Sequence, residues 1–162
     1  MSDTKKILLT ILLGALIIFG SIYTSTRNNN ANDQSSNDGN ATVKLGLLTF
    51  HTNISQALET ARSENKMIYI YARSEFCGWC KQFEAESLSD ERIIGILNEN
   101  FILVRVDAVK QKSLALNLGI SVTPYSIFTT SEGKDIPGAR IPGYMDQESF
   151  YLHLSGIINN EE

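Results

Sequence analysis

The chain is poor in the two residue types that most often bind transition metals. Its 162 residues include only two cysteines, Cys77 and Cys80, and two histidines, His51 and His153. A structural zinc site needs four ligands, and the two histidines lie far apart and form no HxxxH pair. The sequence therefore argues against zinc, although the two cysteines have the spacing of half a zinc site. We interpret both histidines as ordinary polar residues.

Clusters of basic residues and glycine-rich phosphate-binding loops are also absent. Three of the 14 basic residues and one of the 18 acidic residues lie at or before Arg27, which leaves 11 and 17 beyond it and a formal charge of −6. Binding to nucleic acid or to anionic lipid surfaces requires basic patches. We therefore expect no nucleic-acid partner and no cofactor.

Charged residues are missing from Ile7 to Tyr23, and this apolar run shows no polar helix face. Its length is at the short end of the range for a membrane-spanning helix, and no clear small-x-small cleavage site follows it. We predict that residues 1–26 form an N-terminal membrane anchor, with a cleaved signal peptide as the alternative. Because Lys5 and Lys6 precede the run, the positive-inside rule places the N-terminus in the cytoplasm and the remainder outside.

Large apolar residues are missing from Arg27 to Asn40, a segment rich in Asn, Ser, Asp and Gly. Such a composition cannot bury a core. We predict that residues 27–43 are a flexible polar linker and that residues 44–162 form one folded domain.

Apolar patterns in residues 44–162 predict alternating strands and helices. A short apolar piece, Leu45–Phe50, opens the domain. Predicted strands are residues 67–72, 101–106 and 125–129, with a weaker one near Arg140. Predicted helices are residues 54–65 with Asn53 as N-cap, one that begins at the cysteines, one from Ser89 or Asp90, 111–118 and 147–158. This order predicts an α/β fold with a central mixed β-sheet flanked by helices.

The cysteine pair lies between the predicted strand 67–72 and a helix. A thiolate at a helix N-terminus is stabilised by unpaired backbone N–H groups and by the helix dipole. We therefore predict that Cys77 is the nucleophile of a thiol–disulfide exchange and that Cys80, one turn into the helix, is the resolving thiol. An inert structural disulfide is the alternative, but a bridge over two residues restrains the unfolded chain little.

Three motifs together resemble the thioredoxin superfamily over roughly Leu45 to Asn159. They are the strand–Cys-Gly-Trp-Cys–helix unit, the segment Gly119–Pro124 before a strand, and Gly143 before the last helix. The resemblance implies a thioredoxin-like fold and a cis peptide bond at Pro124, which would face the cysteines. It also implies that Thr123 offers its backbone to an extended substrate.

The chain departs from thioredoxin itself around the cysteines. Thioredoxin has Gly-Pro between its cysteines, where this chain has Gly78 and Trp79, and we predict that Trp79 is an exposed platform for substrate. Thioredoxin also has a buried aspartate six residues before the first cysteine, where this chain has Tyr71. Glu84, one turn after Cys80, is a candidate to replace it in proton transfer, with a solvated helix glutamate as the alternative.

These observations predict an extracytoplasmic, membrane-tethered oxidoreductase that reduces or isomerises disulfides of exported proteins. Its partners would be protein thiols and disulfides, an unidentified electron donor and the membrane. Strong oxidants of the superfamily often have His between the cysteines, whereas Gly78 and Trp79 carry no positive charge, which favours a reductase. A thiol oxidase and a client-binding module with a non-cycling disulfide are the alternatives.

Overall fold

The computed structural model describes residues 42–161, which form six strands and five helices. The strands are β1 (Thr42–Leu45), β2 (Leu48–His51), β3 (Met67–Arg73), β4 (Phe101–Asp107), β5 (Tyr125–Thr129) and β6 (Asp135–Pro142). The helices are α2 (Ile54–Glu64), α3 (Gly78–Glu86), α4 (Glu91–Asn100), α5 (Lys112–Asn117) and α6 (Gln147–Glu161). The predicted anchor and almost all of the predicted linker lie outside the described residues.

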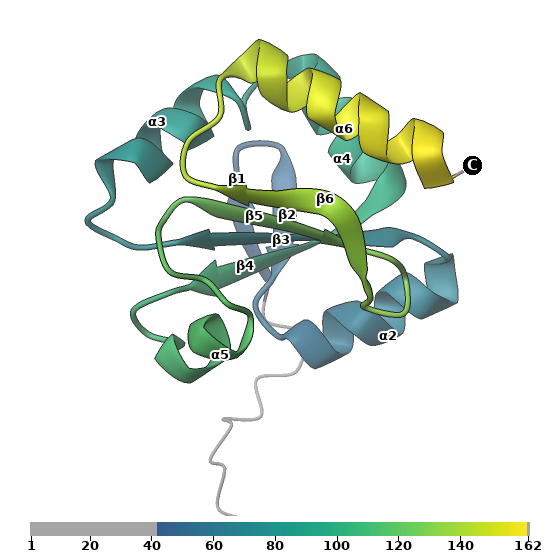
Figure 1. Cartoon of the computed structure of the whole chain (residues 1–162), viewed down its shortest axis with the longest axis horizontal. Coiled ribbons are helices and arrows are strands. Elements are labelled where there is room, and N and C mark those ends of the chain that lie inside the picture. The colour runs from purple at the N-terminus through teal and green to yellow at the C-terminus, as the bar shows by residue number, and fades with distance from the viewer. Residues whose placement is uncertain (1–41, 162) are drawn as a thin grey trace, which may run out of the picture. The chain divides into compact units, whose positions relative to one another are not determined.

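All six strands join one mixed sheet in the order β1-β2-β4-β3-β5-β6 (Figure 1). β3 runs parallel to β4 on one side and antiparallel to β5 on the other. The predicted α/β fold with a mixed sheet is therefore confirmed. Since β3 and β4 are parallel and β5 is antiparallel, the carboxyl ends of β3 and β4 meet the start of β5 at one edge.

The opening apolar piece, Leu45–Phe50, proved to be more than a single segment. It belongs to the hairpin of β1 and β2, which turns at Gly46 and begins at Thr42, two residues before the predicted domain start. Gly46 has a φ of +57°, a conformation that suits glycine and reverses the chain here. The weaker strand that was predicted near Arg140 is β6, which extends over Asp135–Pro142.

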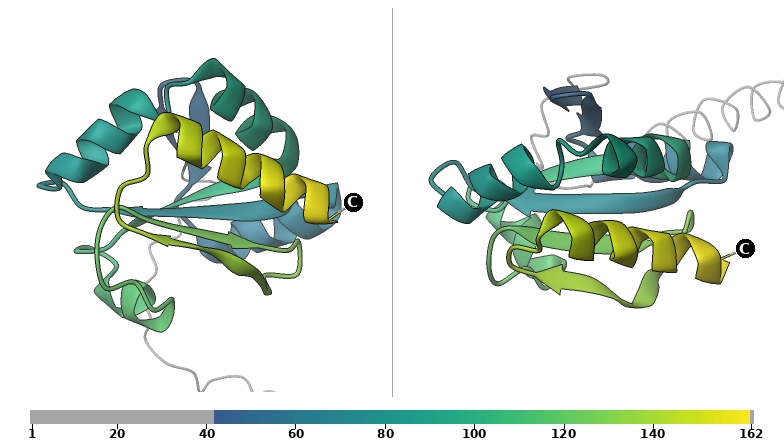
Figure 2. Two further views of the ribbon diagram at one scale, coloured as in Figure 1. Left: turned by 45° about the horizontal axis from the view of Figure 1, so that its top comes forward. Right: turned by 90° about the horizontal axis from the view of Figure 1, so that it is seen from above.

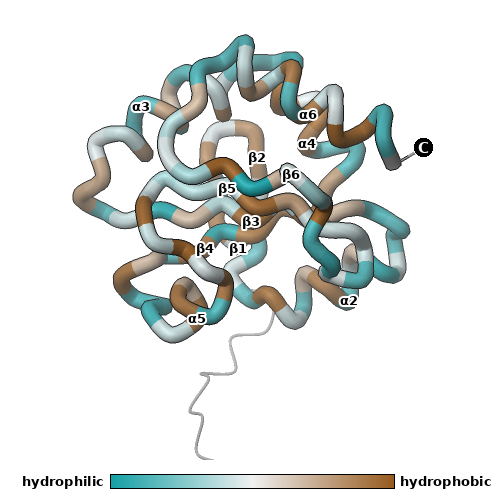
Figure 3. Tube along the Cα trace, viewed as in Figure 1, coloured by the Kyte–Doolittle hydropathy of each residue, from teal (hydrophilic) through white to brown (hydrophobic). Residues whose placement is uncertain are grey.

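The side chains of β3 alternate between two hydrophobic layers, as the period of a strand requires. Tyr69 and Tyr71 pack on the face covered by α3, α4 and α6, whereas Ile68, Ile70 and Ala72 pack on the face covered by α2 and α5. From above, α4 and α6 run side by side along the sheet (Figure 2). Hydrophobic residues accordingly concentrate in the central strands, while the helices alternate between hydrophobic and hydrophilic residues (Figure 3).

Local signals in the sequence start the helices where they were predicted. The Asn53 side chain accepts hydrogen bonds from the backbone N–H groups of Ser55 and Gln56 at the start of α2. Asp90 caps α4 in the same way, and its ion pair with Arg92 holds the pKa of the Asp90 carboxyl well below its usual range. The polar caps and the apolar spacing were sufficient to predict both helices.

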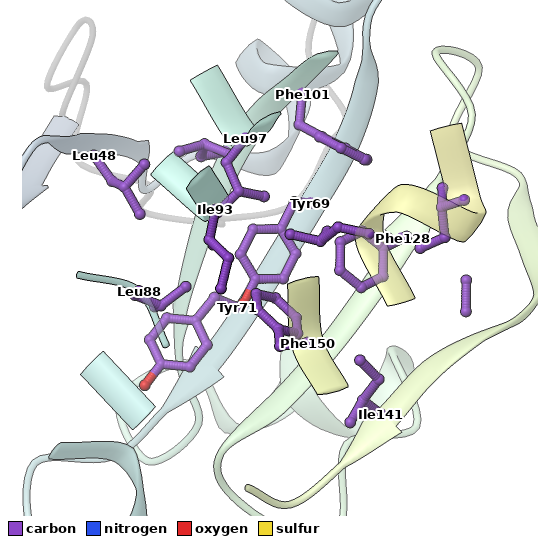
Figure 4. Close-up of a cluster of buried hydrophobic side chains, with 14 of the residues drawn as sticks. Leu48, Tyr69, Tyr71, Leu88, Ile93, Leu97, Phe101, Phe128, Ile141 and Phe150 are labelled. Atoms are coloured by element: carbon purple, nitrogen blue, oxygen red, sulfur yellow. The ribbon is translucent and has the colours of Figure 1, made fainter. Parts of the chain in front are cut away.

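An aromatic cluster fills the layer beneath α3 and α6 (Figure 4). The ring of Tyr69 stacks on that of Phe128, with 4.8 Å between the ring centroids. The centroid of the Phe150 ring lies 6.1 Å from that of Tyr69. The Tyr69 hydroxyl forms a 3.0 Å hydrogen bond with the Ser126 hydroxyl of β5, and both side chains are buried. Burial raises the pKa of Tyr69, so this hydroxyl stays protonated.

None of the helices within residues 42–161 combines the length and hydrophobicity of a membrane span.

We predict that Tyr69→Phe destabilises the domain by about 1–3 kcal/mol, because it leaves the buried Ser126 hydroxyl without its partner. The double variant with Ser126→Ala should regain part of that loss, since no unpaired buried hydroxyl remains. Urea unfolding of the wild type and of both variants measures the difference. A single variant as stable as the wild type would contradict the role of this bond.

Candidate functional site

Cys77 and Cys80 form a disulfide at the edge where β3 ends and α3 begins. Their Cα atoms lie 5.2 Å apart. Cys77 is the N-cap residue of α3 with an extended backbone, and Cys80 lies in the first turn. Cys80 packs on the face of α3 that also buries Phe83, because residues three apart lie on one side of a helix.

The two sulfurs have different surroundings. Cys77 is partly exposed, whereas Cys80 is 0% exposed. The Cys77 Sγ accepts a 3.0 Å hydrogen bond from the backbone N–H of Cys80. In the dithiol form this N–H and the positive end of α3 stabilise negative charge on Cys77. The geometry therefore suits Cys77 as the attacking thiolate and Cys80 as the protected second thiol.

The loop before β5 places Thr123 and Pro124 against the disulfide. Thr123 precedes a cis peptide bond to the buried Pro124, as the resemblance implied. The carbonyl oxygen of Thr123 lies 3.4 Å from the Cys77 Sγ. The Pro124 carbonyl accepts a 2.8 Å bond from the N–H of Gly143, which ties this loop to the turn after β6. The three motifs of the resemblance thus meet at one place.

Behind the disulfide lies a cluster of polar side chains, which we call the buried polar cluster: Tyr71, Arg73 and Glu84. Glu84 Oε1 accepts a 3.0 Å hydrogen bond from the Tyr71 hydroxyl and a 2.6 Å bond from Arg73 Nε. The Tyr71 hydroxyl also lies 3.5 Å from the backbone carbonyl of Cys80. The side chains of Arg73 and Glu84 are only 17% and 14% exposed.

Electrostatics in the buried polar cluster keep Tyr71 neutral. Burial and the negative charge of Glu84 raise the pKa of Tyr71 far above its usual range. Tyr71 therefore acts as a hydrogen-bond donor, and its hydroxyl points out of the aromatic cluster (Figure 4). Glu84, predicted for proton transfer, lies one turn from Cys80 and is partly buried, unlike a solvated helix glutamate.

Sequence reasoning missed two members of the buried polar cluster. It gave Tyr71 no role in the site, and the predicted strand 67–72 stopped one residue short of Arg73, the last residue of β3. The period of two along β3 was the available signal, because Tyr69, Tyr71 and Arg73 alternate onto the face where α3 lies. The helical spacing of Cys80 and Glu84 turns the carboxylate toward that same face.

Exposed apolar side chains surround the disulfide. Phe76, directly before Cys77, is 93% exposed, and Trp79 is 60% exposed, as predicted for a platform. The ring of Trp79 lies 5.5 Å from that of Tyr144. Exposed apolar side chains that cluster often mark an interaction site, whereas isolated ones are common on protein surfaces. The role of Trp79 in substrate binding stays a prediction.

A groove of about 270 Å³ begins at Thr123 and extends between the loop after β4 and α5. It is lined mainly by small and apolar side chains, among them Val109, Leu116 and Val122. Lys112 is the single charged residue in its lining. This groove suits an apolar side chain of a peptide that lies along Thr123.

The histidines take no part in these arrangements. His153 is a residue of α6, and its ring packs against Phe128. Burial lowers the pKa of His153. His51 ends β2. Among residues 42–161, no group of three or more His, Cys, Asp or Glu side chains has a geometry that could hold a metal ion.

Comparison with known proteins identifies relatives of the domain. The family profile described as "Thioredoxin-like domain" matches residues 54–156. "Thiol:disulfide interchange protein DsbD" of Photorhabdus laumondii is 32% identical over 107 residues, which are 63% of this chain and 19% of that protein. The protein of the same name from Escherichia coli is 31% identical over 104 residues, or 62% of this chain and 18% of that protein. The matched segment thus spans about a fifth of the length of these relatives.

Solved structures share the fold at lower identity. A thioredoxin from Thermus thermophilus superposes with a TM-score of 0.59 at 23% identity, covering 66% of this chain and 85% of its own. The C-terminal domain of DsbD from Neisseria meningitidis, in the reduced form, gives 0.52 at 20% identity, covering 64% and 92%. With the family profile spanning most of the described residues, the chain belongs to the family of thioredoxin-like domains.

Proposed function

We propose that the chain is a protein thiol–disulfide oxidoreductase that works through Cys77 and Cys80. The observation that carries the proposal is the position of the Cys77 sulfur at the N-terminus of α3, 3.4 Å from the Thr123 carbonyl and partly exposed, with Cys80 buried behind it. A stabilising disulfide has no need of an exposed sulfur beside an open backbone segment. The names of the DsbD relatives, which specify thiol:disulfide interchange, agree with this assignment.

The exchange proceeds in two balanced steps. The Cys77 thiolate attacks one sulfur of a client disulfide, so that the client S–S bond breaks, a mixed disulfide forms and the other client sulfur leaves as a thiolate. Cys80 then loses its proton and attacks the Cys77 Sγ, which re-forms the internal disulfide and releases the second client thiolate. Two electrons pass to the client, whose two sulfurs take up the two protons. A thiol or dithiol donor then reduces the site again.

Binding of the client rests on the surface around Cys77. An extended client segment can use the backbone of Thr123 for hydrogen bonds, while its side chains contact Trp79, Phe76 or the groove lined by Leu116. Apolar contacts of this kind select chain segments that a folded protein would bury. The proposed substrates are therefore disulfides in incompletely folded or exported proteins.

The proposed direction is reduction or isomerisation of client disulfides. Gly78 and Trp79, the two residues between the cysteines, bring no positive charge to the thiolate. The absence of such a charge favours the disulfide over the thiolate form of the site and hence electron transfer to the client. A thiol oxidase and a client-binding module with a locked disulfide are the competing functions.

The proposed location is outside the cytoplasm, with the domain held to the membrane by residues 1–26. Lys5, Lys6 and the uncharged run Ile7–Tyr23 support this orientation. A compartment that permits disulfides also suits the proposed chemistry. Secretion after signal cleavage is the alternative.

We predict that Cys80→Ser traps mixed disulfides with clients, because the second step needs the Cys80 thiol. Non-reducing electrophoresis of cells that produce the full chain should show adducts that disappear on reduction. The matched control, Cys77→Ser, should give few adducts, since its remaining thiol is buried. Equal trapping by both variants would contradict the assigned roles, and trapping by neither would favour the binding module.

The direction of exchange is tested by equilibrating the purified protein with glutathione buffers and quantifying its dithiol form. We expect a reduction potential below that of the glutathione pool and near the value of about −270 mV that is typical of thioredoxin. A value near the roughly −120 mV of a strong oxidant such as DsbA would contradict a reductase and favour the thiol oxidase.

The orientation is tested by adding protease to intact spheroplasts that produce the full chain. We expect loss of the domain while a cytoplasmic control protein remains intact. Protection of the domain would contradict the orientation. A soluble product that starts near Ser25 would show signal cleavage instead of an anchor.

A further inference from the structure

We propose that Arg73 is a positioning residue of the redox site, which fixes the carboxylate of Glu84 on the buried side of the cysteine helix α3 and balances its charge at the dithiol. This inference rests on the proposed function and adds a residue to it. Nothing in the CxxC motif or in the loop of Thr123 points to Arg73.

The guanidinium of Arg73 forms an ion pair with Glu84 of the cysteine helix. Its Nε donates to Glu84 Oε1 at 2.6 Å, the shortest bond in the buried polar cluster. The backbone of Arg73 is itself held at the end of β3, where its carbonyl accepts a 2.9 Å bond from the N–H of Ala108. A side chain anchored in this way fixes the carboxylate, and Tyr71 donates to the same oxygen at 3.0 Å.

Because the side chains of Arg73 and Glu84 are largely buried, their charges affect the neighbouring cysteines more strongly than exposed charges would. Charges that are largely removed from water interact more strongly with their neighbours than exposed charges do. Glu84 alone would place an unbalanced negative charge one turn from Cys80 and oppose formation of a thiolate. With Arg73 bound to it, the pair is close to neutral as seen from the dithiol. The Tyr71 hydroxyl, 3.5 Å from the Cys80 carbonyl, links the pair to the cysteine helix.

Other titratable groups near the pair come from β3, from β4 and from the turn after β4. Tyr69 and Tyr71 of β3 are both neutral, since burial raises the pKa of each. Asp107 of β4 lies opposite Arg73 in the sheet, and its carboxylate is occupied by the backbone N–H groups of Val109 and Lys110. Burial by itself would raise the pKa of Asp107, but these bonds and the charges of Lys110 and Arg73 together lower it. Asp107 is therefore charged at neutral pH and lies 3.9 Å from the ammonium of Lys110, whereas Arg73 and Glu84 form the ion pair that includes a residue of the cysteine helix.

The test measures the rate at which iodoacetamide alkylates Cys77 of the reduced full-length chain as a function of pH. Mass mapping identifies the alkylated cysteine. Arg73→Gln leaves Glu84 unbalanced, so the apparent pKa of Cys77 should rise, by about one unit, which slows alkylation about tenfold below the pKa. Glu84→Gln leaves Arg73 unbalanced and should lower the apparent pKa. The double variant should return close to the wild type, and Arg73→Lys should preserve most of the wild-type profile.

A purely structural role predicts a different pattern, in which both single variants lower the melting temperature and shift the Cys77 profile in the same direction or not at all. That result would overturn the proposal. Arg92→Gln is the matched control, since it removes an arginine from an exposed ion pair on α4 and should leave the profile unchanged. If Arg73→Gln fails to fold, Glu84→Gln and Arg73→Lys decide the question by the same criterion. An unreactive Cys77 in the wild type would contradict the proposed function itself.

Discussion

The pairing of β3 with β4 and β5 is the constraint on which the site depends. Parallel pairing sets Arg73 beside Asp107 at one edge of the sheet, and antiparallel pairing sets Ala72 beside Tyr125 at the same edge. The chain leaves β3 toward the cysteines there and enters β5 directly after Pro124. The Thr123 carbonyl and the Cys77 sulfur meet because two strands far apart in the sequence share this register.

Strand β3 also links the hydrophobic core to the chemistry. Its alternation places Tyr69, Tyr71 and Arg73 in order on the face beneath α3, α4 and α6, so the layer changes from aromatic core to charged cluster along one strand. Tyr71 belongs to both, with its ring packed near Phe83 and its hydroxyl bound to Glu84. A buried ion pair contributes little net stability by itself, because desolvation offsets the attraction. Its place beside a disulfide suggests a function in tuning the thiols, which the charge variants measure directly.

The asymmetry between the two cysteines follows from helix geometry. Cys77 stands at the N-cap, where backbone N–H groups have no carbonyl partner, and Cys80 follows one turn later on the buried side. Exposed aromatic and aliphatic groups then surround only the accessible sulfur. One sulfur thus meets clients while the other is shielded from them, which is the division of labour that the proposed exchange requires.

The helices, the strands and the two cysteines of the site could be predicted from the amino-acid sequence. Hydrophobic periodicity, the caps at Asn53 and Asp90 and the CxxC spacing are local signals, and the structure agrees with them. The resemblance to the thioredoxin superfamily added the cis bond at Pro124 and its place beside Cys77. The convergence of Arg73 and Tyr71 on Glu84 and the groove that extends from Thr123 toward Leu116 became visible in the folded domain. These contacts join residues on different elements. Local periodicity sets the face on which each side chain lies, but strand register and helix packing determine which side chains meet.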